Sequence, residues 1–152
     1  MTFKRVIVPY EGGALCEDAL RLACELARDG TRVTAVYVVR TPPSMPIGAE
    51  EAEEGVGREM LKRAEAIGRE LGADVESYLA KAPEVAEGIN ETAATLDADA
   101  IVMSLRHKHA PGETLVLSHT ASRVLRHAPL PRTHHLQPQR AVERRWRVAA
   151  GL

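Results

Sequence analysis

The residues with the clearest chemical potential lie between Ala100 and Pro131. An apolar run that ends at Ser104 is followed by a polar loop, and a helical pattern then starts near Ser118. In an open α/β sheet, the carboxyl end of a strand and the N-terminus of the next helix form an anion site, because unpaired backbone N–H groups point at the ligand there. This stretch is therefore a candidate phosphate-binding site.

The loop in this stretch is cationic and poor in glycine. Arg106, His107, Lys108 and His109 follow one another, and Gly112 is the one glycine of the loop. A cradle of backbone N–H groups needs glycines, because a Cβ blocks the approach of the anion. Arginine can instead hold phosphate through paired hydrogen bonds. Two interpretations stay open: a phosphate site made by side chains, and a solvated basic loop over a closed pocket.

Strands and helices are expected to alternate along the chain. Short runs rich in β-branched or apolar residues predict strands at residues 4–9, 32–39, 74–80 and 100–103. Apolar residues at three- and four-residue spacing, with turn signals at the ends, predict helices at residues 14–28, 50–71 and 83–95 and from about residue 118. The glutamates at the start of the helix at 50–71 are expected to be a solvated helix end. This alternation predicts a three-layer α/β/α open sandwich with a mainly parallel sheet over residues 1–131, followed by a tail at 132–152.

Composition excludes several classes of protein. The 152 residues suit one hydrophobic core, and an aromatic content of 3% argues against a stacking platform for single-stranded nucleic acid. No apolar run approaches the ~20 residues of a membrane helix, and the N-terminus enters a strand directly instead of forming a signal peptide. Cys16 and Cys24 lie in one predicted helix, too far apart for a disulfide. We expect a cytoplasmic protein with reduced thiols and no membrane contact.

The charge distribution and the polar motifs predict neither nucleic-acid binding nor a metal site. The net charge is −1, and the tail at 132–152 is basic, with five Arg and one Glu. The pairs His107/His109 and His134/His135 lack the spacing and the cysteines of a zinc site. The chain has no Gly-x-Ser-x-Gly elbow and no Gly-x4-Gly-Lys-Ser/Thr loop, so an enzymatic activity is left open without a motif in its favour.

Five segments in this order resemble the universal stress protein family, and together they span about residues 1–131. They are Val6–Gly13, Val33–Val39, Ala82–Ile89, Ala98–Met103 and Ala121–Pro131. The resemblance implies the adenine-nucleotide alpha-hydrolase-like α/β fold. It also implies a choice between two branches of the family, one that binds ATP and one that does not.

The resemblance places a nucleotide site on specific residues of this chain. The adenosine positions would be Pro9, Tyr10, Glu11, Val38 and Met103, and the phosphate positions would be Ser104, His107, Ser118, His119 and Thr120, with Arg106 beside them. Glu11 stands where the family usually has Asp, one methylene shorter. None of the three glycines of the family's Gly-x-x-Gly-x9-Gly-Ser/Thr loop is present, and the second gap is ten residues instead of nine.

These departures favour one function and leave a second one open. The favoured function is a stress-response or regulatory module with a degenerate adenine-nucleotide pocket that binds ATP weakly or not at all, and whose partner is another protein. The alternative is a protein that binds a phosphorylated ligand, ATP or AMP, through the cationic loop Arg106-His107-Lys108.

The tail departs from the family as well. Where the family continues with a short strand that commonly pairs across a homodimer, residues 132–140 contain no β-branched run. Val142, Trp146 and Ala149 would share one side of a short helix. The alternatives are a disordered basic tail, a helix that packs on the domain or on a partner, and a change of reading frame in the gene. Loss of the last strand would expose the edge of the strand at 100–103, which puts the homodimer in doubt.

Overall fold

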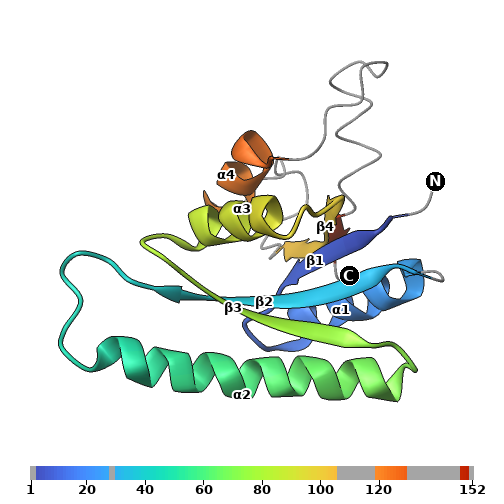
Figure 1. Cartoon of the computed structure of the whole chain (residues 1–152), viewed down its shortest axis with the longest axis horizontal. Coiled ribbons are helices and arrows are strands. Elements are labelled where there is room, and N and C mark those ends of the chain that lie inside the picture. Colours follow the sequence, from blue (N-terminus) through green and yellow to red (C-terminus); the bar gives the residue numbers. More distant parts are fainter. Residues whose placement is uncertain (1–2, 28–29, 106–118, 130–147, 151–152) are drawn as a thin grey trace, which may run out of the picture.

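Strands and helices alternate as the sequence predicts (Figure 1). The computed structural model describes residues 3–27, 30–105, 119–129 and 148–150. The elements in chain order are β1 (Arg5–Pro9), α1 (Ala14–Leu26), β2 (Arg32–Arg40), α2 (Ala49–Glu70), β3 (Val75–Ala82), α3 (Val85–Thr95), β4 (Ala100–Ile101), β5 (Met103–Leu105), α4 (His119–His127) and β6 (Val148–Ala150).

Four strands form one parallel sheet in the order β3-β2-β1-β4. In the register of this sheet, Val6 of β1 pairs with Val33 of β2 on one side and with Ala100 of β4 on the other. The centres of β1 and β2 are buried, as expected for β-branched runs that are covered on both faces. The predicted α/β sandwich with a parallel sheet is confirmed.

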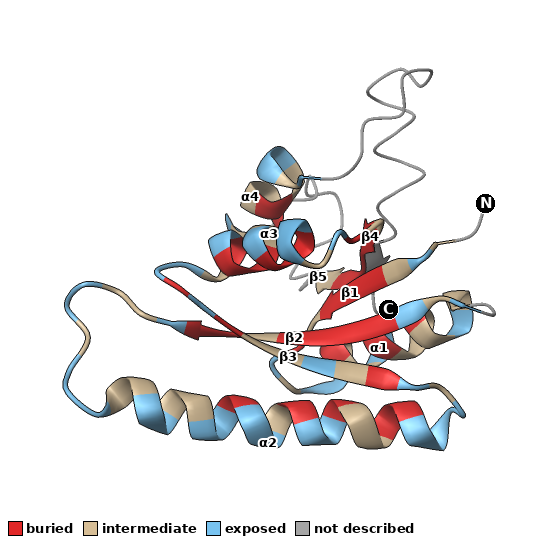
Figure 2. Cartoon of the chain, viewed as in Figure 1, coloured by how far each residue is buried: buried red, intermediate tan, exposed pale blue. Residues whose placement is uncertain are grey.

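Helices cover both faces of this sheet (Figure 1). Successive residues of β1 point to opposite faces, so the core has two halves (Figure 2). Val8 packs in the half that contains Ile67 of α2, and α1 contributes to the same half. Ile7 packs in the other half with Ile89 of α3 and Val124 of α4. The three layers are therefore α1 and α2, the sheet, and α3 and α4.

Gly57 lowers the helix propensity of α2 but allows the helix to pack closely on the sheet. A Cβ on Gly57 would lie 2.5 Å from Cδ1 of Tyr37 and 2.8 Å from Cδ1 of Leu79. The helix can approach β2 and β3 this closely only without a side chain at that position. Tertiary packing thus outweighs the propensity penalty of about 1 kcal/mol for a glycine in a helix.

Most predicted boundaries differ from the structure by one or two residues, and two of the differences have a clear physical reason. α3 begins at Val85, so Pro83 precedes the helix, and Glu84, with extended φ and ψ of −132° and 147°, is its N-cap. The expected strand at 100–103 is divided at Val102, whose N–H donates to the carbonyl of Ile7 (2.9 Å). Beyond this bond, β5 no longer pairs with β1, because Pro9 has no backbone N–H to donate to the next carbonyl of the ladder.

The last described residues of the tail form a strand. β6 pairs in parallel with β5, with Met103 opposite Val148 and Leu105 opposite Ala150. The helical alternative is therefore wrong for Ala149, which lies in β6. The backbone of β5 has a partner that the sequence did not predict, because β-propensity is weak where pairing with a distant segment decides the conformation. Val142 and Trp146 lie outside the described residues.

Two smaller expectations have clear outcomes. Cys16 and Cys24 both lie in α1 as free thiols, and Cys16 is buried whereas Cys24 is half-buried. None of the helices in the described segments is long and apolar enough to cross a membrane.

Candidate functional site

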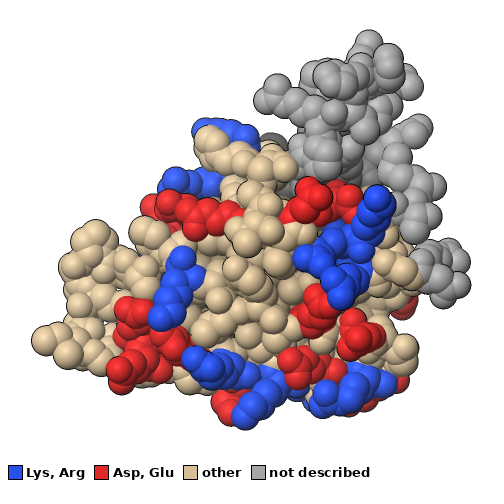
Figure 3. Space-filling view, in the orientation of Figure 1, with Lys and Arg blue, Asp and Glu red and all other residues tan. Residues whose placement is uncertain are grey.

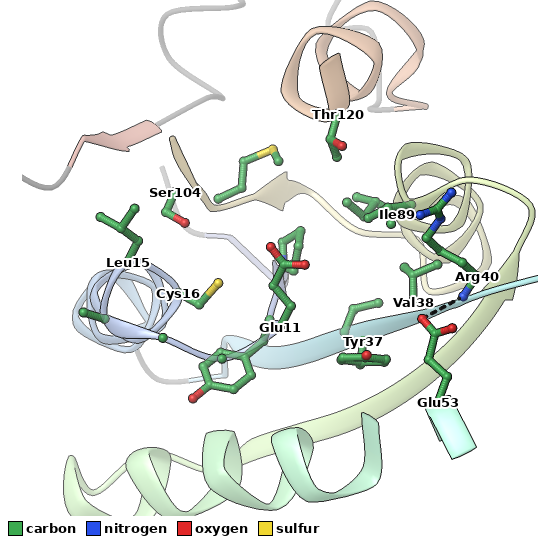
Figure 4. Close-up of a pocket in the computed structure, with 18 residues that line it drawn as sticks. Glu11, Leu15, Cys16, Tyr37, Val38, Arg40, Glu53, Ile89, Ser104 and Thr120 are labelled. Atoms are coloured by element: carbon green, nitrogen blue, oxygen red, sulfur yellow. Dashed lines mark hydrogen bonds between the residues drawn. The ribbon is translucent and has the colours of Figure 1, made fainter. Parts of the chain in front are cut away.

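A cavity of about 520 Å³ opens at the carboxyl ends of β1 and β2, below the first turn of α4 (Figure 4). It lies where the helix after β1 goes to one face of the sheet and the helix after β5 goes to the other, which is the usual place of a ligand crevice in an open α/β sheet. Its volume is typical of a small-molecule site, which has about 300–1,000 Å³.

Most of the residues that the sequence predicts for a ligand site line this cavity. They are Pro9, Tyr10, Glu11, Val38, Met103, Ser104 and Thr120. His119 is the exposed first residue of α4, and it does not contribute to the lining. Arg106, His107 and Ser118 lie outside the described residues, so the role of the cationic loop stays a prediction. Segments far apart in the sequence meet here because parallel strands end at the same edge of the sheet.

The turn from β1 to α1 aims Glu11 at the cavity (Figure 4). Gly12 and Gly13 have φ of +89° and +88°, which residues with a Cβ rarely adopt. Just before them, the Tyr10 N–H donates to the carbonyl of Val36 (2.8 Å) and prolongs the β1–β2 pairing to the cavity floor. The exposed Glu11 carboxylate is therefore free to accept hydrogen bonds from a ligand.

Tyr10 packs into the core beneath the floor of the cavity, on the side of α1 and α2. Only 1% of this residue is exposed, and it packs with Leu61 in the core half under α1 and α2. Burial raises the pKa of the Tyr10 phenol, the Glu17 carboxylate raises it further, and the Arg63 guanidinium opposes the shift. Arg63 also donates from Nε to Glu17 Oε1 (3.2 Å), which joins α2 to α1. The phenol therefore stays neutral at physiological pH.

The walls on the α3 side are apolar. Val38 and Met103 are each 8% exposed, and Ile89 of α3 is fully buried beside them. Gly88 allows α3 to lie against β2, since a Cβ there would be 2.5 Å from Cγ1 of Val38. The ion pair between Arg123 of α4 and Glu84 links the two helices of this layer. These walls suit a flat apolar group such as a heterocyclic base.

Sequence reasoning missed two charged residues of the lining, Arg40 and Glu53. The Arg40 N–H donates to Glu53 Oε1 (3.3 Å), so the end of β2 is tied to α2 (Figure 4). At the start of α2, which the sequence predicts to be solvated, Glu50 and Glu54 pair with Lys81, whereas Glu53 lines the cavity. The signal in the sequence that could have identified Arg40 as a site residue was its position at the carboxyl end of a central strand.

The surface of the molecule differs in character from this cavity. On the face shown in Figure 3, basic and acidic side chains are interspersed. Many of them form exposed ion pairs, such as Arg32 with Glu76 (3.3 Å) and Lys62 with Glu59 (3.0 Å). Within the described segments, no three His, Cys, Asp or Glu residues lie close enough to hold a metal ion. The cavity is thus the strongest candidate for a ligand site in this part of the chain.

Solved structures of other proteins share this architecture. A universal stress protein family member from Burkholderia pseudomallei is 31% identical, with a TM-score of 0.64 over 84% of this chain and 92% of that one. A universal stress protein from Archaeoglobus fulgidus, solved in complex with dAMP, is 26% identical, with a TM-score of 0.66 over 84% and 92%. A family protein from Arabidopsis thaliana with AMP bound is 14% identical and shares the fold, with a TM-score of 0.60 over 84% and 88%.

A comparison with curated proteins found no match, whereas a comparison with protein-family models agrees with the structural result. The model of the universal stress protein family matches residues 2–133, which contain all the described elements except β6. Because the match extends over most of the chain, and solved structures of family members share its fold, this chain belongs to the universal stress protein family.

Proposed function

We propose that this chain is a regulatory universal stress protein that binds a nucleotide mainly through its nucleoside part and binds ATP weakly. The observation that carries the proposal is the preformed cavity with apolar walls and a carboxylate at its floor. The dAMP complex of the Archaeoglobus fulgidus protein, 26% identical to this chain, supports a nucleotide as the ligand.

The nucleoside half of the site has the groups that a base and a ribose require. Val38 and Met103 offer apolar contact to the faces of a base, and Glu11 offers a charged acceptor to ribose hydroxyls. Hydrogen bonds to a charged group contribute about 1.5–3 kcal/mol each when water is excluded. We expect this half alone to bind a nucleoside in the micromolar range.

The sequence indicates that the phosphate half of the site binds its part of the ligand more weakly than the nucleoside half does. The loop after β5 contains a single glycine, Gly112, and Pro111 removes one backbone donor from it. The N-terminus of α4, with Thr120 in the cavity lining, still offers N–H groups to one phosphate. We therefore expect one phosphate to add to binding and the further phosphates of ATP to add little.

The test is calorimetric titration of the full chain with adenosine, AMP and ATP. We expect AMP to bind in the micromolar range and ATP to bind within about threefold of AMP, because solvated phosphates gain little from distant charges. ATP binding at least about 30-fold tighter than AMP, equivalent to one or more charged hydrogen bonds, would show an intact phosphate cradle and overturn the proposal.

A matched pair of variants locates the ligand. Glu11→Ala should weaken adenosine and AMP equally, by about tenfold, because it removes a charged acceptor for the ribose. Glu87→Ala, which removes an exposed glutamate of α3 outside the lining, should leave both affinities unchanged. If none of the three ligands releases heat, the proposal fails and the function lies with a protein partner.

The second candidate function is phosphate binding by the cationic loop, and the run of Arg106, His107 and Lys108 favours it. The double substitution of Arg106→Ala and Lys108→Ala distinguishes it from the first. Under our proposal this variant binds AMP as the unmodified chain does. A loss of AMP or ATP affinity above about tenfold would instead assign the phosphates to this loop, since each charged contact contributes about 1.5–3 kcal/mol.

A further inference from the structure

Arg40 brings a guanidinium without an ion-pair partner in the described residues to the part of the cavity that lies beyond the end of β2. It is the last residue of β2, two residues beyond Val38, and both line the cavity. In Figure 4 the guanidinium lies on the side of β2 that faces Ile89 of α3, whereas Glu53 lies on the α2 side. Glu53 therefore contacts the backbone of Arg40 and leaves its charged end to the cavity.

The carboxylates near this end of the sheet already have other partners. Glu50 pairs with Lys81 at 2.8 Å, Glu54 pairs with the same lysine, and Glu84 pairs with Arg123. Arg40 lies opposite Ala82 of β3 in the sheet and lines the cavity. Among the residues that the structure describes, no carboxylate forms an ion pair with Arg40. Its five donors are therefore available to a ligand.

The position of Arg40 indicates that it would contact the base of the ligand. This step rests on the proposed function, in which the base packs against Val38 and the ribose lies at Glu11. In Figure 4, Ser104 lies toward α1 and Arg40 lies at the opposite end, beyond Val38. A base held over Val38 thus presents its edge to Arg40, while its sugar and phosphate point toward Ser104 and Thr120.

The chemistry of a guanidinium discriminates between purines. It carries donors only, in a planar fork that pairs with two adjacent acceptors. A 6-oxopurine presents such acceptors at O6 and N7, whereas adenine presents an amino donor in place of O6. We propose that Arg40 reads the edge of the base and makes this pocket favour 6-oxopurine nucleotides over adenine nucleotides.

The test compares IMP with AMP, which differ at position 6 of the purine. We expect IMP to bind the full chain more tightly than AMP. Arg40→Ala should weaken IMP by about tenfold and leave AMP within about twofold, because it removes a bidentate contact that only the oxo group completes. Arg32→Ala is the matched control: this arginine begins the same strand at the far end, and it pairs with Glu76. It should change neither affinity.

The outcomes separate this inference from the proposed function. If both nucleotides bind and Arg40→Ala leaves the ratio of their dissociation constants unchanged, Arg40 does not read the base, while the proposed function stands. A Glu53→Gln variant that selectively weakens AMP would show that the carboxylate accepts from an adenine amino group, which also overturns the inference. If neither nucleotide binds, the inference and the proposed function fail together.

Discussion

Gly12 and Gly13 show how single residues decide the geometry of the site. Both have positive φ, and together they turn the chain from β1 into α1 so that Glu11 faces the cavity. Their surroundings differ, because a Cβ on Gly12 would lie 2.7 Å from Sδ of Met60, whereas a Cβ on Gly13 would have no atom within 4 Å. The sequence predicts a tight turn from these two glycines, but only the packed α2 distinguishes them.

This difference predicts the effects of two equivalent substitutions. Gly13→Val should destabilise the protein by about 1–3 kcal/mol through backbone strain alone. Gly12→Val should cost about 1 kcal/mol more, because it also displaces the side chain of Met60. Urea unfolding of both variants measures these losses. Equal free energies of unfolding for the two would contradict the proposed contact with α2.

At the level of elements, the packing of α3 on β2 controls the width of the cavity. Gly88 faces Val38 and Ala82, and a Cβ at this position would lie 2.5 Å from the nearer Val38 methyl group and 3.2 Å from the Ala82 Cβ. The next residue, Ile89, lines the cavity. A change that moves α3 therefore changes a wall of the ligand site as well as the core.

Substitution of glycine by alanine in two helices separates packing from helix propensity. Gly55→Ala in α2, where a Cβ meets no atom within 4 Å, should stabilise the protein by about 0.5–1 kcal/mol through propensity. Gly88→Ala should destabilise it by about 1–3 kcal/mol, because α3 must move away from β2. Thermal melting reports both, and nucleotide titration should show weaker binding for Gly88→Ala alone. A stabilised Gly88→Ala variant would mean that α3 is not held this closely.

At the level of the whole molecule, a strand near the C-terminal end of the chain returns to the vicinity of the cavity. β6 pairs with β5, and β5 carries Met103 and Ser104 of the lining. β5 has left the pairing with β1, so within the described segments β6 is its one partner strand. The tail, which the sequence presents as an appended basic segment, thus contributes backbone hydrogen bonds beside the cavity.

Two truncations test this contribution. Deletion of residues 148–152 removes β6 and should lower the stability by about 1–2 kcal/mol, since three residues of pairing supply a few hydrogen bonds of about 0.5–1.5 kcal/mol. The melting temperature should fall by about 2–4 °C for each kcal/mol. Deletion of residues 151–152 alone keeps β6 and should leave the melting temperature unchanged. If the longer deletion also melts at the original temperature, the pairing with β5 contributes nothing to stability.

The sequence by itself determined the alternation of strands and helices, the parallel sheet and the family, because burial patterns and turn glycines are local signals. Through the resemblance to the family it also pointed to Pro9, Glu11, Val38 and Met103, which line the cavity. Only the tertiary structure decided that Arg40 and Glu53 meet at the cavity and that residues 148–150 form a strand. Such contacts depend on the packing of whole elements and on pairing across 45 residues of sequence, from Met103 to Val148, and local propensity does not encode them.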